Sequence, residues 1–228
     1  MDQESISNTL KIKELGRVKH DSNLTSHSLY KIVSDFYGIE LNRLHEKFPQ
    51  VVKLLDFETD QSTEIHKKFY ELGETAEFLS LYMEFVLAEI VPKFKNDGKL
   101  LVQKIPSFRV QIPNNIAVAE YHKDSDYSHN TYETNIFLPF TDAVDSATIY
   151  AETKANSKVM APLNTLLDEM YLWDGANCVH GNLVNISSKS RVSLDFRILP
   201  EKYYKKNEVI KSVTTNKKMI IGDYWVEI

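Results

Sequence analysis

Apolar residues recur at helical spacing through the first hundred residues of the chain. In the first such stretch they follow the i, i+3, i+4, i+7 pattern of one helix face: Leu29, Ile32, Val33 and Phe36. Gly38 follows this stretch as a stop signal. A second, shorter stretch covers residues 41–48 and ends before Pro49. The pattern predicts two helices early in the chain.

The longest periodic stretch runs from about residue 62 to residue 91. Its apolar positions keep a 4-3-4-3 spacing: Ile65, Phe69, Leu72, Ala76, Leu79, Met83, Val86 and Ile90. Asp60 or Ser62 can cap its start, and Pro92 can close it. We expect one long helix that packs against its own domain, because a heptad pattern this short usually marks a buried stripe and not a coiled coil.

From about Lys99 the period of the apolar pattern changes to two, which predicts strands. The predicted strands are 108–112, 116–122, 133–140, 147–153, 157–160, 169–173, 177–180, 191–199 and 217–227. Helices first and strands afterwards favour an α+β fold over a parallel sheet. We expect an antiparallel sandwich or barrel over residues 99–228, ending in a C-terminal extension, with residues 1–98 as a helical part of the same domain.

Composition narrows the class of protein. The chain has 228 residues and a formal charge of −5, so nucleic acid is not expected as a partner. No apolar run is long enough for a membrane span, and the first residues lack the apolar core of a signal peptide. Cys178 is the single cysteine, which excludes an intrachain disulfide and suits a cytoplasmic protein. No glycine-rich phosphate loop is present.

Histidine carries the first chemical signal. Four of the seven histidines fall on polar faces of the helical half, whereas His122 lies near the end of a predicted strand with Asp124 two residues on. Side chains at i and i+2 of a strand share one face, about 6.6 Å apart at their bases, so their tips can converge on one ion. Asp126 shares the same parity and competes with Asp124, which we prefer because i+2 is the shorter bridge.

His180 and a downstream arginine strengthen this signal. About four strands fit between Asp124 and His180, so a closed jelly roll can return His180 to the same end. Two histidines and one carboxylate are the ligand set of non-haem Fe(II) oxygenases. Arg191 and Ser193 then share one strand face, opposite the apolar face of the same strand. An arginine fork with a neighbouring hydroxyl suits a planar carboxylate.

In combination, His122-x-Asp124, His180 and Arg191-x-Ser193 resemble the signature of Fe(II)/2-oxoglutarate-dependent dioxygenases. Longer strings are similar to the StrG-like oxygenases of streptomycin-type and sporadic carbohydrate biosynthetic clusters. These strings are FRVQIPNNIAVAEYHKDSDYSH, ETNIFLPFTDAVDSATIYAET and CVHGNLVNISSKSRVSLDFRILP. The resemblance covers about residues 105–200 and, more loosely, IGDYW near the end.

The resemblance implies a double-stranded β-helix (a jelly roll, cupin-like) with the N-terminal helices packed against its sheet. It implies that His122, Asp124 and His180 bind Fe(II), and that Arg191, helped by Ser193, holds the C5 carboxylate of the cosubstrate 2-oxoglutarate. Asn135 would bind the C1 carboxylate or a metal-bound oxygen, or else satisfy local backbone groups. The implied reaction consumes O2 and releases succinate and CO2, and with Asp124 present it favours hydroxylation, or a desaturation, epimerisation or ring closure from the same radical.

The substrate implied by this branch is a small polar metabolite: a sugar, an aminocyclitol or an amino-acid-derived compound. Several polar residues are candidates to contact it: Arg109, Asp126, Tyr127, His129 and Arg197. We expect no membrane partner, and a homodimer stays open.

Two alternatives to the oxygenase stay open. A cupin-like metal-dependent isomerase or epimerase would not use 2-oxoglutarate, would leave Arg191 structural, and would turn over without oxygen. A non-catalytic jelly-roll binding module would keep its binding after loss of His122 or His180.

Overall fold

The computed structural model describes residues 16–20, 25–49, 63–118, 120–206, 208–213 and 216–228. The helices of the described chain are α2 (Thr25–Tyr37), η1 (Leu41–Arg43), α3 (Leu44–Lys47), α4 (Glu64–Gly73), α5 (Ala76–Phe85), η2 (Val86–Ile90) and η3 (Val91–Phe94). Short 3-10 turns follow as η4 (Asp124–Tyr127), η5 (Asp145–Ala147) and η6 (Glu201–Tyr203). The two early helices are confirmed, and α2 ends where Gly38 adopts a positive φ of 63°.

The single long helix predicted over residues 62–91 is wrong. Thr75 interrupts it, because its Oγ1 accepts a hydrogen bond from the Phe78 amide at 3.3 Å and so caps a new helix, α5. The buried stripe shifts at this break, so that Phe78 and Tyr82 are buried whereas Ala76 is exposed. At the start of α4 the N-cap is Thr63, and the caps expected at Asp60 or Ser62 lie outside the described residues.

The strands form two antiparallel sheets. The larger sheet has the order β1-β7-β4-β9-β2-β10, with β3 also paired to β9, and the smaller has the order β6-β5-β8. The strands are β1 (Gly16–Lys19), β2 (Leu100–Gln103), β3 (Ser107–Gln111), β4 (Thr134–Pro139), β5 (Ile149–Glu152), β6 (Met160–Pro162), β7 (Glu169–Trp173), β8 (His180–Asn182), β9 (Arg191–Pro200) and β10 (Trp225–Glu227). The α+β class and the antiparallel pairing are therefore as predicted.

Several strand predictions need correction. Of the expected strands 157–160 and 177–180 only the last residue of each lies in a strand, and of 217–227 only Trp225–Glu227 does. The expected strand 116–122 is absent from its described residues, where only His122 forms an isolated bridge. Conversely, β1 lies within the part of the chain predicted as helical and pairs with β7, from Gly16 opposite Leu172 to Lys19 opposite Glu169. The N-terminal part therefore contributes to the large sheet as well as to its helical cover.

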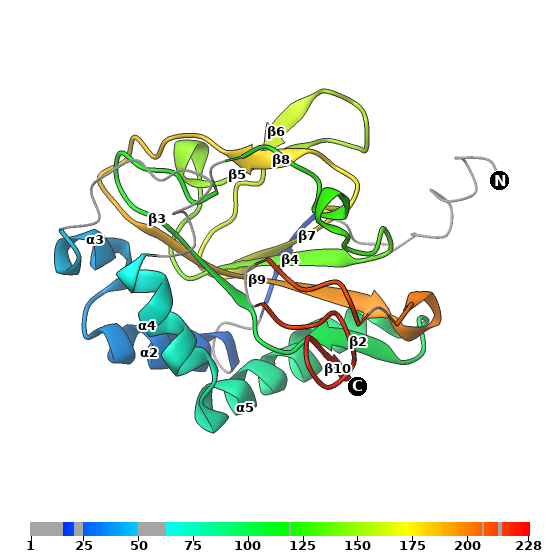
Figure 1. The fold of residues 1–228 in the computed structure, drawn as a ribbon. Coiled ribbons are helices and arrows are strands. Elements are labelled where there is room, and N and C mark those ends of the chain that lie inside the picture. Colours follow the sequence, from blue (N-terminus) through cyan, green and yellow to red (C-terminus); the bar gives the residue numbers. More distant parts are fainter. Residues whose placement is uncertain (1–15, 21–24, 50–62, 119, 207, 214–215) are drawn as a thin grey trace.

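The elements stack in three layers, with the smaller sheet on one side of the larger sheet and the helices on the other (Figure 1). The main core fills the space between sheet and helices, where Phe108 of β3 stacks on Phe69 of α4 with ring centroids 4.1 Å apart. A second core lies between the sheets and includes Phe137, Ile149 and Trp173. Side chains that do not join this second core are free to form a site between the sheets.

Strand β9 divides its residues between these two spaces. Val192, Leu194, Phe196 and Ile198 belong to the core under the helices. The alternate positions face the smaller sheet because side chains in a strand alternate between its two faces: Arg191, Ser193, Asp195 and Arg197. The alternation predicted from the sequence is thus present in the structure.

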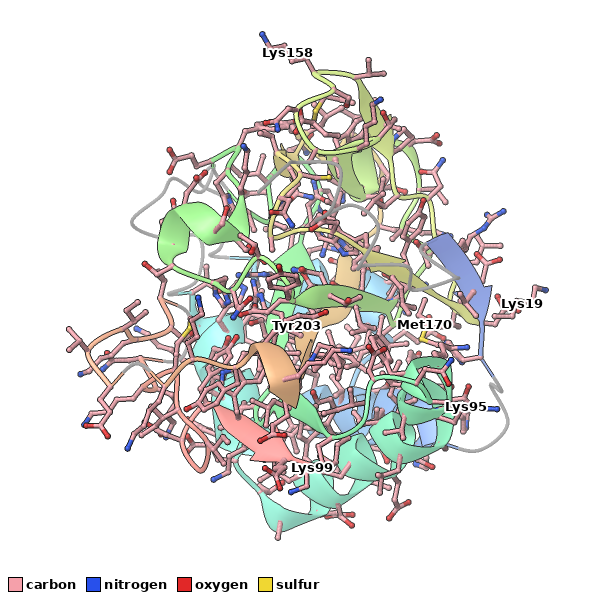
Figure 2. All side chains as sticks on the ribbon, turned by 90° about the vertical axis from the view of Figure 1, so that its right-hand side faces the viewer. Lys19, Lys95, Lys99, Lys158, Met170 and Tyr203 are labelled. Atoms are coloured by element: carbon pink, nitrogen blue, oxygen red, sulfur yellow. The ribbon has the colours of Figure 1, made fainter. Side chains whose placement is uncertain are left out.

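Charged side chains cover the outside of the molecule. Figure 2 shows Lys19, Lys95 and Lys158 pointing outward, and all three are exposed. Among the described residues no helix has both the length and the apolar character that a membrane crossing requires.

Candidate metal centre

His122 and His180 are brought together by their own backbones. Each residue's amide donates a hydrogen bond to the other's carbonyl oxygen, at 3.0 Å and 2.9 Å, and this pair forms an isolated antiparallel bridge. His180 begins β8 of the smaller sheet, whereas His122 lies in an irregular segment. The two imidazoles consequently lie side by side, with ring centroids 4.5 Å apart.

The hydrogen bonds of the two rings fix which nitrogen is free. Nδ1 of His122 lies 2.9 Å from the Glu120 carbonyl oxygen, and Nδ1 of His180 lies 3.0 Å from the Cys178 carbonyl oxygen. A carbonyl oxygen only accepts, so both Nδ1 atoms must donate and carry the proton. Each Nε2 therefore presents a lone pair, which is the state that a metal ligand needs.

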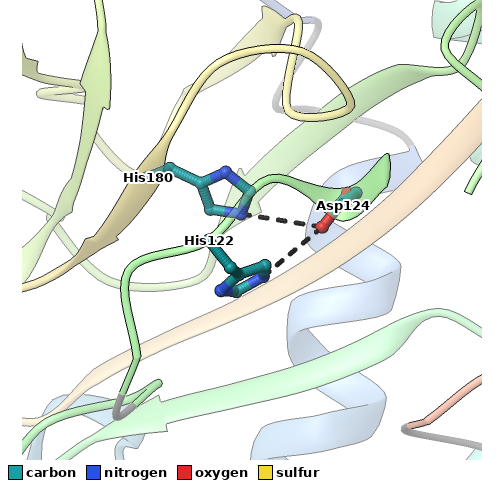
Figure 3. Close-up of side chains that lie close together, drawn as sticks. All are labelled: His122, Asp124 and His180. Carbon is teal, nitrogen blue, oxygen red and sulfur yellow. Dashed lines mark ion pairs between the residues drawn. The ribbon is translucent and has the colours of Figure 1, made fainter. Parts of the chain in front are cut away.

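Asp124 completes the cluster from the 3-10 turn η4, which directly follows His122. Its Oδ1 lies 3.6 Å from Nε2 of His122 and 3.6 Å from Nε2 of His180 (Figure 3). The expected i, i+2 convergence occurs, but through a turn and not along an extended strand. Asp124 is buried, with 3% of its surface exposed.

The chemistry of this donor set fits a divalent cation. One ligand atom from each residue lies within 4.8 Å of the other two, and all three atoms are hydrogen-bond acceptors that face one another. Atoms bound about 2.1 Å from a common ion would be roughly 3.0–3.4 Å apart, close to the spacing found here. Two imidazoles and one carboxylate on one side of an ion leave its other side open.

The protonation states also suit metal binding at neutral pH. Burial lowers the pKa of His180 to about 4, against the opposing effect of Asp124, so this imidazole is neutral. Burial alone would raise the pKa of Asp124, but the Arg197 guanidinium holds it well below its ordinary value. A neutral imidazole and an ionised carboxylate bind metal without losing a proton.

The second oxygen of Asp124 is held by two residues of the large sheet. Oδ2 accepts a hydrogen bond from Asn135 Nδ2 at 2.7 Å and from Arg197 Nε and Nη2 at 3.0 Å and 2.8 Å. Asn135 and Arg197 are direct partners across β4 and β9. From the sequence, Arg197 was a candidate for contacting substrate; in the structure its guanidinium lies against Asp124.

Arg191 and Ser193 lie further along the same face of β9. Arg191 is 1% exposed, donates from Nη1 to Ser193 Oγ at 2.9 Å, and lies over the Phe137 ring. Its Nε has no hydrogen-bond partner, and among the described residues no carboxylate pairs with its guanidinium. Burial lowers the pKa of Arg191 to about 10, although the charge of Asp195 opposes this.

A cavity between the sheets connects these groups. Its polar walls come from His122, Asp124, Asn135, His180, Asn182, Arg109, Arg191, Asp195 and Arg197, and its apolar walls from Val118, Ile136, Ile149 and Trp173 with Phe196. Arg109 faces Asp195, with Nε 3.7 Å from Oδ2. Burial raises the pKa of Asp195, although Arg109 and Arg191 oppose this. Three guanidiniums and two carboxylates give the cavity a positive excess.

The three polar candidates that follow Asp124 lie outside this cavity lining. Asp126 is exposed, and its Oδ2 accepts a hydrogen bond from the Lys123 amide, so Asp124 and not Asp126 joins the two histidines. The Tyr127 ring packs edge-on against His122 at 5.1 Å. His129 pairs with Glu133, with Nδ1 2.8 Å from Oε2.

Two glycines allow close packing around the site. A Cβ on Gly175 would lie 2.7 Å from the Asn135 side chain, and a Cβ on Gly181 would lie 2.8 Å from the Tyr121 ring. Gly175 also accepts a hydrogen bond from the Asp124 amide through its carbonyl oxygen. The sequence feature that pointed to Gly175 was its position two residues after Trp173, in the turn before His180.

The comparisons with known proteins agree with this architecture. No protein-family model matches the chain. The apo form of the non-heme monooxygenase ThoJ has a similar structure, with a TM-score of 0.55 and 10% sequence identity over 90% of this chain and 84% of that chain. AviO1 from Streptomyces viridochromogenes Tue57 is matched with a TM-score of 0.48 and 12% identity, over 90% of this chain and 98% of that chain.

One curated protein has a higher sequence identity to this chain than these two structures have. The streptomycin biosynthesis protein StrG of Streptomyces griseus is 35% identical over 170 residues, which are 74% of this chain and 78% of that protein. This identity over most of both chains agrees with the resemblance found in the motifs around His122 and His180. The chain belongs to the family of the streptomycin biosynthesis protein StrG.

Proposed function

We propose that this protein is an Fe(II)- and 2-oxoglutarate-dependent oxygenase that hydroxylates a small polar metabolite. The observation that carries the proposal is one cavity lined by three converging metal-ligand atoms and by a buried guanidinium with which no carboxylate of the described residues forms a salt bridge. The fold similarity to ThoJ, which is named a non-heme monooxygenase, supports the reaction class.

The metal would be held by Nε2 of His122, Nε2 of His180 and Oδ1 of Asp124. Their lone pairs already converge, and the backbone bridge between the histidines holds them in place. When bound, Fe(II) with 2-oxoglutarate and O2 supplies the oxidising power for C–H hydroxylation and releases succinate and CO2. The protein's part is to hold these groups together and to exclude bulk water.

Arg191 is the residue that we assign to the distal carboxylate of 2-oxoglutarate. Within the cavity lining Arg197 pairs with Asp124 and Arg109 faces Asp195, which leaves Arg191 as the cation most in need of an anion. Ser193 accepts from Arg191 and donates to Asp195 at 3.0 Å, so it orients the guanidinium. Asn135 acts on Asp124 in the structure, and its Oδ1 has no partner.

The cavity walls fit a substrate with both polar and apolar surface. Trp173 and Ile149 offer apolar contacts, whereas Asn182, Asp195 and Arg109 offer groups that hydrogen-bond to hydroxyl or amino substituents. We further propose that the two facing sheets are the halves of a double-stranded β-helix, with this cavity between them.

The two alternative functions, an isomerase or epimerase and a binding module, give Arg191 a different role. An isomerase or epimerase that does not use 2-oxoglutarate leaves this arginine with a structural role, and a structural arginine is normally paired when buried. Arg191 is buried with a free Nε, which favours the oxygenase. The binding module gives no reason for three acceptor atoms to face one another.

The test is succinate formation from 2-oxoglutarate, measured with Fe(II) under air across a panel of sugars, aminocyclitols and amino acids. We expect at least one compound to raise succinate release well above the uncoupled background. His180→Ala should abolish the stimulated release, whereas His27→Ala, a matched change at an exposed helix position, should not. Conversion of a panel compound without oxygen or 2-oxoglutarate would establish the isomerase instead.

A further inference from the structure

The two oxygens of Asp124 have different surroundings. Oδ1 faces the two imidazole Nε2 atoms at 3.6 Å each, and no hydrogen bond from a described residue reaches it. Oδ2 accepts three N–H groups, from Asn135 Nδ2 and from Arg197 Nε and Nη2, within 3.0 Å. A carboxylate oxygen offers about two lone-pair directions, so Oδ2 is fully used. Only Oδ1 is left for a metal.

The Arg197 guanidinium is itself fixed on its other edges. Nη1 donates to Gln103 Oε1 at 3.3 Å and to the Tyr224 hydroxyl at 3.4 Å, and Nε lies 3.6 Å from Glu133 Oε2. Its side chain is 11% exposed. Glu133 is held in turn by the His129 ring and by the Asn130 amide. The Arg197 guanidinium that binds Asp124 is therefore part of a buried polar network, whose hydrogen bonds fix its position.

The backbone places the two donors together. Arg197 on β9 and Asn135 on β4 are direct cross-strand partners, so both side chains rise from neighbouring points of the same sheet face. Gly175 leaves room for the Asn135 side chain, because a Cβ at this position would lie 2.7 Å from it. Neighbouring strands of one sheet hold such a pair more rigidly than loops would.

We infer that Arg197 and Asn135 are positioning residues that fix Asp124 as a one-oxygen metal ligand. This inference rests on the proposed function. By occupying Oδ2, the two residues prevent the carboxylate from turning to bind through both oxygens. The side of the ion away from the protein then keeps its open positions for the cosubstrate. Arg197 contributes by contacting Asp124 and not by contacting substrate.

The test compares the same substitution at two buried arginines of β9. Co(II) serves as an oxygen-stable probe for the metal, and its affinity and absorption spectrum are measured for wild type, Arg197→Lys and Arg191→Lys. Lysine keeps the charge but loses the two-pronged contact. We expect Arg197→Lys to lower Co(II) affinity about 10- to 100-fold, as is typical when the partner of a metal ligand is lost. Its spectrum should change, because the carboxylate is free to rotate.

Arg191→Lys should leave Co(II) affinity and spectrum as in wild type while weakening 2-oxoglutarate binding. Asn135→Ala removes a single hydrogen-bond donor to Asp124, so it should change the Co(II) affinity and spectrum in the same direction as Arg197→Lys but by less. If Arg197→Lys does not fold, Asn135→Ala takes its place in the test. Wild-type Co(II) affinity and spectrum in both folded variants would overturn the inference and leave the metal site standing. Failure of the wild-type protein to bind Co(II) would overturn the proposed function, and this inference with it.

Discussion

Arg191, which we propose as the residue that binds 2-oxoglutarate, is buried in a way that works against the stability of the fold. Its guanidinium is buried between the sheets with a free Nε and an aromatic ring below it. Burying a charge without a counter-ion costs free energy that the native state must offset elsewhere. A residue kept for structure alone would not have this signature, so its contribution to stability separates the two roles.

Replacing Arg191 with methionine tests this distinction. We expect 2-oxoglutarate affinity to fall roughly 10- to 150-fold, because a hydrogen bond to a charged group contributes about 1.5–3 kcal/mol. The free energy of unfolding in urea should stay equal or rise, because an uncompensated buried charge is removed. Lower stability combined with unchanged 2-oxoglutarate affinity would mean that Arg191 is structural.

His66 is a second buried ionisable residue, remote from the metal ligands in sequence. It is 1% exposed, its Nδ1 lies 2.7 Å from Thr63 Oγ1, and its Nε2 has no partner. Burial, and next the charge of Arg109, lower its pKa to about 3. The unfolded chain therefore takes up a proton below about pH 6.5, while the folded protein does not until about pH 3. Stability must fall with falling pH across this window.

His66→Gln should reduce this acid sensitivity. The contribution of His66 is at most about 1.4 kcal/mol for each pH unit below 6.5, so roughly 2–3 kcal/mol by pH 4.5. Urea unfolding of wild type and variant at pH 7 and pH 4.5 measures the difference, with His27→Gln at an exposed position as the control. Equal losses of stability in wild type and His66→Gln would contradict the burial argument.

At the scale of elements, the break between α4 and α5 decides which residues enter the core. Thr75 Oγ1 accepts from the Phe78 amide and donates to the Leu72 carbonyl oxygen at 2.8 Å, so it ends one helix and begins the next. The second helix then buries Phe78, Tyr82 and Phe85. A continuous helix would have presented a different stripe to the sheet.

Thr75→Ala distinguishes the broken helix from a continuous one. Loss of the cap should lower the free energy of unfolding by about 1 kcal/mol, whereas Thr75→Ser, which keeps the hydroxyl, should be nearly neutral. In a continuous helix alanine would instead be the better residue, and the variant would gain stability. The urea concentrations at which wild type, Thr75→Ala and Thr75→Ser are half unfolded show whether each substitution lowers or raises the free energy of unfolding. A stabilised Thr75→Ala would show that Thr75 does not act as a cap.

Strand β9 is the element whose two faces the sequence predicted best. Alternation along β9 gave the correct face for Arg191 and Ser193, because a period of two leaves no freedom once one face is apolar. The alternation over 116–122 wrongly predicted a strand, because a strand also requires a neighbouring strand with which to pair. Asn114 has a φ of 59°, and the chain there hydrogen-bonds to Asn185 of another loop.

The candidate site was predictable to a similar degree. The spacing of His122, Asp124 and His180 indicated the cluster that the structure contains. The contact between Arg197 and Asp124 was not predictable, since it depends on β9 lying beside β4 and on the path of the turn η4. Such pairings are set by tertiary packing, and the local sequence does not record them.

At the scale of the whole molecule, the helices cover one face of the large sheet (Figure 1), and the cavity lies at its other face. The proposed ligands come from both sides of the cavity: His180 from the smaller sheet, His122 and Asp124 from the segment bridged to it, and the arginines from the larger sheet. A bound metal and cosubstrate would therefore contact residues of both sheets. Their binding should be coupled, because 2-oxoglutarate needs both the ion and Arg191.

Anaerobic calorimetric titration of 2-oxoglutarate measures this coupling most directly, with the wild-type protein either loaded with Fe(II) or stripped of metal. We expect one 2-oxoglutarate bound per chain in the loaded protein and binding at least roughly tenfold weaker without metal, a difference of about 1.4 kcal/mol or more. Equal affinity in both forms, or no binding to a protein that holds stoichiometric Fe(II), would contradict this expectation.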